Sequence, residues 1–137
     1  MRKLWLKSLL LLTALTLVLG QMTAWAGKIE EIKARGKLIA GVKDAVVPFG
    51  FVDEKTNQLV GFDIDICRYI AQKLGVKLEL KPVTSATRIP MLAQGSVDIA
   101  AATMTHKFSR EDSIDFSITY FMDGQKLLVK KGSGIKS

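Results

Sequence analysis

Residues 62–75, FDIDICRYIAQKLG, carry the strongest structural signal in the sequence. Apolar side chains recur every four residues, at Phe62, Ile66, Ile70 and Leu74, which is the spacing of one face of an α-helix. Two aspartates lie in the first turn, where carboxylates favour the positive end of the helix dipole, and a glycine follows the last turn. The pattern predicts an amphipathic helix over residues 62–74.

Strand patterns occur on both sides of this helix. Residues 37–42 (KLIAGV) and 97–102 (VDIAAA) are apolar runs typical of buried strands, and residues 76–83 alternate as a strand. A second helix, from Thr84 or Ser85 through Gln94, separates the last two runs, and a short helix over residues 29–35 precedes the first. The order strand, helix, strand, helix, strand predicts an α/β fold with a mostly parallel βαβαβ sheet and right-handed crossovers.

The first 26 residues have the three-part layout of a secretory signal peptide. A basic start is followed by an apolar run from Leu9 to Gly20 and by a small-residue exit at residues 24–26. A transmembrane helix is the alternative, but the apolar run is shorter than the roughly 20 residues that span a bilayer. We therefore expect a signal peptide over residues 1–26 and a single exported, soluble domain over residues 27–137.

Composition excludes several functional classes. The chain has 20 basic and 13 acidic residues, and three of the basic ones belong to the expected signal peptide, so a general nucleic-acid surface is not indicated. One cysteine, Cys67, and one histidine, His106, leave no basis for a disulfide, a multi-thiolate metal site or a histidine-pair zinc site. Motifs for nucleophilic catalysis or phosphate binding are missing, so we expect no enzyme, no metal and no cofactor.

Three cations follow the predicted strands, at the edge where parallel sheets bind ligands. They are Lys43, Arg88 and Arg110. A cation in the first turn of a helix opposes the dipole, so the position of Arg88 suggests a function, although a solvated surface arginine is the alternative. An arginine fork can hold a carboxylate through two parallel hydrogen bonds, and Thr103 and Thr105 add hydroxyl groups near Arg110.

An aromatic residue adds to this candidate site. Phe49, in the loop that carries residues 48–51, could form an apolar wall of a small-ligand pocket, although core packing is an equal alternative. Residues 53–61, DEKTNQLVG, follow and are rich in turn formers and charge, which predicts an exposed hairpin-like excursion.

Four segments together resemble one family of proteins. They are GVKDAVVPFGF (41–51), GFDIDICRYIAQKLGV (61–76), SATRIPMLAQGSVDIAAATMT (85–105) and REDSIDFSITYF (110–121). In this order they resemble the bacterial periplasmic solute-binding proteins of polar amino-acid ABC importers, over essentially all of residues 29–137. The resemblance implies the first lobe of a type II periplasmic-binding-protein fold, in which two α/β lobes close on one amino acid.

The resemblance also implies roles for individual residues. Arg110 would grip the α-carboxylate of the ligand, with Thr103 and Thr105 as hydroxyl partners. The RIP segment is similar to that of glutamate- and aspartate-binding members, so Arg88 would reach a side-chain carboxylate, and Lys43 stands where such members have a basic residue. The implied protein is a periplasmic monomer that delivers an acidic amino acid, glutamate or aspartate, to an ABC permease of the inner membrane.

The last residues depart from the family pattern. The sequence ends with GQKLLVKKGSGIKS (124–137), which resembles the first strand that crosses between lobes, so we expect residues 27–137 to contain the first lobe without the second. We therefore expect the chain alone to bind an amino acid weakly or not at all. Two alternatives stay open, namely a dehydratase-like enzyme on the same fold and a truncated remnant that binds nothing.

Overall fold

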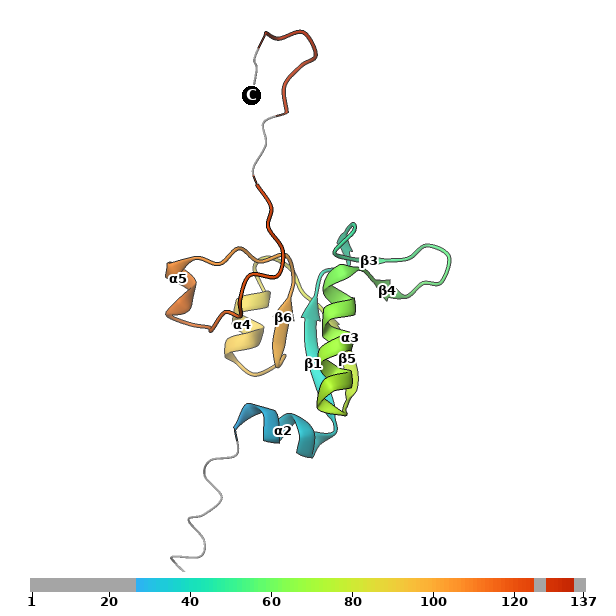
Figure 1. The fold of residues 1–137 in the computed structure, drawn as a ribbon, viewed down its shortest axis with the longest axis vertical. Coiled ribbons are helices and arrows are strands. Elements are labelled where there is room, and N and C mark those ends of the chain that lie inside the picture. Colours follow the sequence, from blue (N-terminus) through green and yellow to red (C-terminus); the bar gives the residue numbers. More distant parts are fainter. Residues whose placement is uncertain (1–26, 125–127, 135–137) are drawn as a thin grey trace, which may run out of the picture. The chain divides into compact units, whose positions relative to one another are not determined.

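A computed structural model describes residues 27–124 and 128–134. Contacts divide the chain into two compact units, and the boundary along the sequence falls between Met104 and Thr105. The first unit contains α2 (Lys28–Arg35), β1 (Lys37–Val42), β2 (Ala45–Val46), β3 (Gly50–Val52), β4 (Leu59–Val60), α3 (Phe62–Leu74), β5 (Lys77–Pro82), α4 (Arg88–Ala93) and β6 (Ile99–Ala101). The second unit contains α5 (Phe108–Glu111). Figure 1 shows these elements along the chain.

The main sheet is parallel, with strand order β5-β1-β6. The central strand β1 pairs with β5 from Lys37 opposite Lys77 to Val42 opposite Pro82, and with β6 from Ala40 opposite Ile99 onward. Because β1 has a neighbour on each side and is covered on both faces, residues 38–42 are all buried, which explains their continuous apolar sequence. The parallel βαβαβ arrangement predicted from the sequence is confirmed.

Helix α3 packs on the face of the sheet formed by Leu38, Ala40 and Val42. Figure 1 shows this helix lying along β1 and β5. Its most buried apolar residues are Ile64, Cys67 and Ala71, whereas Phe62 is 42% exposed. The predicted helix is therefore confirmed, but its buried face is displaced from the row that begins at Phe62. A row of every fourth residue advances 40° around the helix at each step and so leaves the buried face.

A small antiparallel sheet interrupts the crossover from β1 to α3. Its strand order is β2-β3-β4, and the turn between β3 and β4 occupies residues 53–58. Asp53 organises this turn, since its carboxylate accepts hydrogen bonds from the N–H groups of Lys55 and Thr56 at 3.0 and 2.8 Å. The predicted hairpin-like excursion is confirmed, but residues 50 and 51, which were expected in a loop, belong to β3.

Helix α4 begins later than its sequence suggests. Thr84 and Thr87 form a reciprocal turn in which each backbone N–H donates to the other hydroxyl, at 2.9 and 3.1 Å. The helix therefore starts at Arg88 and ends at Ala93, not over Thr84 to Gln94. Threonine side chains that bond to nearby backbone groups favour turns and caps over helix interiors. The third strand is also shorter than predicted, at Ile99–Ala101 in place of residues 97–102.

Two expectations concern the ends of the chain. The expected signal peptide, residues 1–26, lies outside the described residues. The expected crossing strand, residues 124–137, falls partly outside them as well, and its described portion, residues 128–134, forms no strand. Within residues 27–124 and 128–134, no helix has the length and apolar character needed to cross a membrane.

Candidate functional site

The carboxyl edge of the parallel sheet brings together residues from three strands. Lys43 follows β1, Ser85 follows β5 and Thr103 follows β6. The ammonium group of Lys43 donates a hydrogen bond of 3.0 Å to the Ser85 hydroxyl, although 42 positions separate the two residues. Parallel strands end at the same edge of a sheet, so these three residues of the first unit follow strands that end at one edge, and their role in a ligand site stays a prediction.

Arg88 is buried, with only 7% of its surface exposed. Its Nη1 atom donates to the carbonyl oxygens of Ala102 at 2.6 Å and Thr103 at 3.3 Å, directly after β6. The alternative of a solvated surface arginine is therefore wrong. These carbonyl dipoles compensate a cation that sits unfavourably at a helix start. Whether Arg88 also contacts a ligand carboxylate stays a prediction.

Thr103 has an unusual backbone conformation, with φ of 50°. Its N–H donates to the carboxylate of Asp63 at 3.1 Å, and its hydroxyl donates to the Ala102 carbonyl at 2.8 Å. Asp63 is fully buried in the first turn of α3. The sequence reveals only that an aspartate near a helix start suits the dipole, so it does not identify Asp63 as a partner of a residue 40 positions away.

Phe49 lies against the start of α3. Its ring meets that of Phe62 edge to face, with centroids 6.3 Å apart and planes at 77°, and its carbonyl accepts the N–H of Asp63 at 2.9 Å. Phe49 is half-buried. That burial is compatible with both roles considered from the sequence, an aromatic wall for a ligand and packing at the rim of the core.

The second unit holds the other two predicted site residues. Arg110 lies in α5, and its Nη1 atom donates to the carbonyl of Thr105 at 2.6 Å. Two residues that the sequence did not single out as a pair, His106 and Glu111, bond across the same turn, and the His106 ring stacks on Phe116 at 4.7 Å. The second unit thus brings Arg110 and Thr105 together, whereas the convergence of Arg110 with Lys43 and Arg88 stays a prediction.

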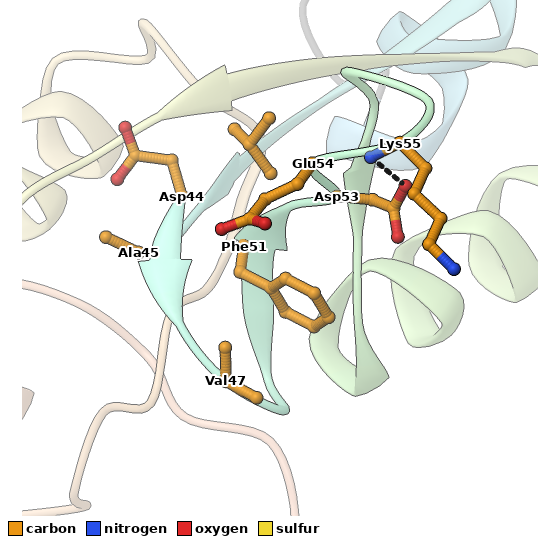
Figure 2. A pocket seen from close by; sticks show the side chains of 8 residues that line it. Asp44, Ala45, Val47, Phe51, Asp53, Glu54 and Lys55 are labelled. Atoms are coloured by element: carbon orange, nitrogen blue, oxygen red, sulfur yellow. Dashed lines mark hydrogen bonds between the residues drawn. The ribbon is translucent and has the colours of Figure 1, made fainter.

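A separate hollow of about 440 Å³ lies on the small antiparallel sheet. Figure 2 shows the residues that line it, which come from β2 and the residues on either side of it, from β3 and from the turn after β3. Its charged groups are the carboxylates of Asp44, Asp53 and Glu54 and the ammonium of Lys55, and none of the six predicted site residues lines it. Excess negative charge makes it a poor site for an acidic ligand, so we do not assign it to binding.

Reactive or metal-ligating groups are sparse in the described part of the chain. It has no cluster of three or more histidine, cysteine or carboxylate side chains that could hold a metal ion. Cys67 is fully buried, and burial, together with the nearby charge of Asp63, raises the pKa of its thiol to about 12. A thiol in this state is a packing group and not a nucleophile.

Two curated relatives are named as amino-acid-binding proteins. A glutamine-binding protein of Geobacillus stearothermophilus is 48% identical over 120 residues, which are 85% of this chain and 46% of that protein. An L-glutamate/L-aspartate-binding protein of Pseudomonas aeruginosa is 32% identical over 117 residues, 80% of this chain and 39% of that protein. The chain spans less than half the length of these curated relatives.

Solved structures show the same fold. The arginine-bound form of domain 1 from TmArgBP has a TM-score of 0.64 and 40% identity, over 66% of this chain and 71% of that chain. An ancestral cyclohexadienyl dehydratase has a TM-score of 0.67 and 36% identity, over 71% of this chain and 40% of that one. Residues 38–136 match the bacterial extracellular solute-binding proteins, family 3. With most of its length covered by that match, this chain belongs to family 3 of the bacterial extracellular solute-binding proteins.

Proposed function

We propose that this chain is the amino-acid-binding first lobe of an extracellular receptor that delivers its ligand to an ABC importer. The observation that carries the proposal is the polar carboxyl edge of the parallel sheet in a member of this family, where Lys43 after β1 bonds to Ser85 after β5. Ligands of open α/β sheets bind at such edges. The named relatives, which bind glutamine, glutamate or aspartate, support an amino acid as the ligand class.

Arg110 is the residue proposed to hold the α-carboxylate. One of its nitrogens bonds to the Thr105 carbonyl, which orients the guanidinium group. A guanidinium group has five N–H donors, so this bond is compatible with a two-point contact to a carboxylate. Thr103 and Thr105 are proposed as its neighbours at the ligand, with Phe49 as an aromatic wall.

The side chain of the ligand is proposed to be acidic. Lys43 at the sheet edge is partly exposed, and among the described residues its ammonium group bonds to the Ser85 hydroxyl and has no carboxylate within salt-bridge distance. Glutamine is the competing ligand, because relatives that are 47 and 48% identical are named for it. Glutamine would need an amide-binding group where glutamate needs the Lys43 charge.

The proposal has four further parts. The chain is exported through a cleavable signal peptide, lies in the periplasm, is a monomer and has an ABC permease as its partner. The family name, which specifies extracellular proteins, supports export. The dehydratase-like alternative retains one supporting observation, the likeness to an ancestral cyclohexadienyl dehydratase. Turnover of prephenate by this chain would favour that alternative over capture without chemistry.

A titration followed by nuclear magnetic resonance tests the binding proposal. We expect glutamate at about 10 mM to shift the amide signals of Lys43, Thr103, Thr105 and Arg110. One lobe alone makes fewer contacts than two lobes closed on the ligand, so we expect a Kd nearer about 1 mM than about 1 μM. The arginine-bound domain 1 of TmArgBP supports binding by a single lobe. If none of the twenty amino acids shifts these signals, the proposal is wrong.

Two variants separate the roles of the cations. Arg110→Ala should abolish the shifts caused by every amino acid, because all of them share the α-carboxylate. Lys43→Met should weaken glutamate and aspartate more than glutamine, whereas Lys55→Met, which removes an exposed lysine of the hairpin turn, should weaken none of them. An equal loss for glutamate and glutamine in Lys43→Met would contradict the acidic assignment.

A further inference from the structure

Thr103 is held in a conformation that its residue type disfavours. A φ of 50° places its backbone in the left-handed region, and threonine is β-branched. A β-branched residue in this region is a rare outlier, because Cβ crowds the backbone there. Such outliers persist where surrounding groups determine the backbone, and they cluster at functional sites.

Two buried, charged side chains contact the two sides of this residue. The carboxylate of Asp63 accepts the Thr103 N–H at 3.1 Å, and the guanidinium of Arg88 donates to the carbonyls of Ala102 and Thr103 at 2.6 and 3.3 Å. Asp63 comes from α3 and Arg88 from α4, so both helices contact the chain where it leaves β6. Asp63 is fully buried and Arg88 is 7% exposed.

We infer that Asp63 and Arg88 are positioning residues that clamp Thr103 in its left-handed conformation and so preform the carboxyl end of β6 for the ligand. The Asp63 carboxylate binds the Thr103 N–H and the Arg88 guanidinium binds the Thr103 carbonyl, so both backbone polar groups of Thr103 are hydrogen-bonded. Hydrogen bonds to ionised groups are about twice as strong as neutral ones, which suits a clamp that opposes backbone strain.

This inference assigns Arg88 a different role from that implied by the family resemblance. As a direct ligand of a side-chain carboxylate, Arg88 would discriminate glutamate from glutamine. As a positioning residue it preforms a turn that every amino acid uses, so its loss weakens all ligands by the same factor. This binding consequence rests on the proposed function, whereas the clamp itself does not.

Amide hydrogen exchange in the full chain tests the clamp without any ligand. In Asp63→Ala we expect the Thr103 amide to exchange at least about tenfold faster, since a bond to a charged acceptor is lost, while the amides of β1 keep their rates. Asp65→Ala is the matched control, because it removes the other first-turn carboxylate of α3, which is exposed and pairs with Arg68. Equal rates for Thr103 in the wild-type chain and Asp63→Ala would overturn the inference.

A glycine at position 103 separates the clamp from general damage to the fold. Glycine adopts a φ of 50° without a Cβ penalty, so Asp63→Ala should lower amino-acid affinity by a smaller factor in a Thr103→Gly background than in the wild-type background. Equal factors in both backgrounds would contradict the clamp. This comparison applies even where Asp63→Ala alone lowers the folded fraction, because a general loss of folding persists in both backgrounds.

Arg88→Gln tests the second half of the clamp. We expect its affinities for glutamate and glutamine to fall by the same factor, and a loss confined to glutamate and aspartate would show direct contact and overturn the positioning role. If the wild-type chain binds no amino acid, the proposed function fails, and the exchange rate of the Thr103 amide still decides whether the clamp exists.

Discussion

Asp98 is the residue whose replacement should cost the most stability outside the apolar core. Its side chain is 1% exposed, and its Oδ2 atom accepts the backbone N–H of Ile39 at 2.8 Å. Arg35 contacts the same oxygen, and Lys28 lies 3.2 Å from the other one. One carboxylate therefore connects α2, the central strand β1 and the start of β6. The conservative perturbation is Asp98→Asn.

The cost can be estimated from these contacts. Asparagine keeps one oxygen for the Ile39 N–H but loses the charge that Arg35 and Lys28 contact. Hydrogen bonds to charged groups contribute about 1.5–3 kcal/mol each. The two cations are 27 and 46% exposed, so water solvates them once the carboxylate is gone. We therefore expect Asp98→Asn to lower the free energy of unfolding by about 2 kcal/mol, nearer one such bond than two.

The loss should depend on pH in a defined direction. Burial alone would raise the pKa of Asp98, but the Ile39 N–H, Lys28 and Arg35 outweigh it and hold that pKa below its ordinary value of 3.8. A carboxyl group whose pKa is lower in the folded state stabilises the protein above its unfolded pKa. That contribution is lost as the pH falls through the folded pKa, so the difference between wild type and Asp98→Asn should shrink below pH 3.8.

Urea unfolding followed by circular dichroism measures this difference. Glu79→Gln is the control, because it breaks the ion pair with Lys37 on neighbouring strands, and water screens such exposed pairs so that they contribute little to stability. Equal free-energy losses for Asp98→Asn and Glu79→Gln at pH 7 would refute the reasoning, as would a difference for Asp98→Asn that persists unchanged at pH 2.

Two further predictions concern Cys67 and Gly61. Cys67 should not react with a thiol reagent in the native protein, because at pH 8 only about one thiol in ten thousand with a pKa of about 12 is ionised, and absorbance after reagent addition checks this. Gly61→Ala should cost at least about 2 kcal/mol in urea unfolding, because φ is 132° and the new Cβ would lie 2.4 Å from the Phe49 carbonyl oxygen. Gly36→Ala, at φ of 72° with open space around it, should cost less.

Local sequence patterns were sufficient to predict the helices and strands, because each pattern reflects a physical requirement of the element in which it lies. The apolar run of β1 reflects burial on both faces, and the glycine after α3 adopts the left-handed conformation with φ of 71° that ends a helix. The start of α4 was predicted wrongly, because Thr84 and Thr87 bond to each other. Sequence patterns suggest that such threonines cap a helix but do not show which of two competing turns they close.

The candidate site was predictable in part. Lys43 and Thr103 were assigned to the carboxyl edge of the sheet because parallel strands must end there, and in the structure the two residues follow β1 and β6, whereas their contact with a ligand stays a prediction. The burial of Arg88 was not predictable, because the local sequence around an arginine in the first turn of a helix does not show whether its side chain faces water or two carbonyl groups. Asp63 was overlooked for the same reason, because the helix dipole alone accounts for its residue type.

The sequence by itself determined the order of the strands and helices, the parallel pairing of the main strands and the edge of the sheet at which polar groups lie. These follow from the periodicity of apolar residues and the positions of glycine, which act over a few residues. Only the tertiary structure decided which charges are buried and what they bond. Asp63 bonds to Thr103, 40 positions away, and Asp98 bonds to Ile39, 59 positions away. Such contacts form only when helices and strands pack, because packing removes water and a buried charge is stable only when other groups of the chain bond to it.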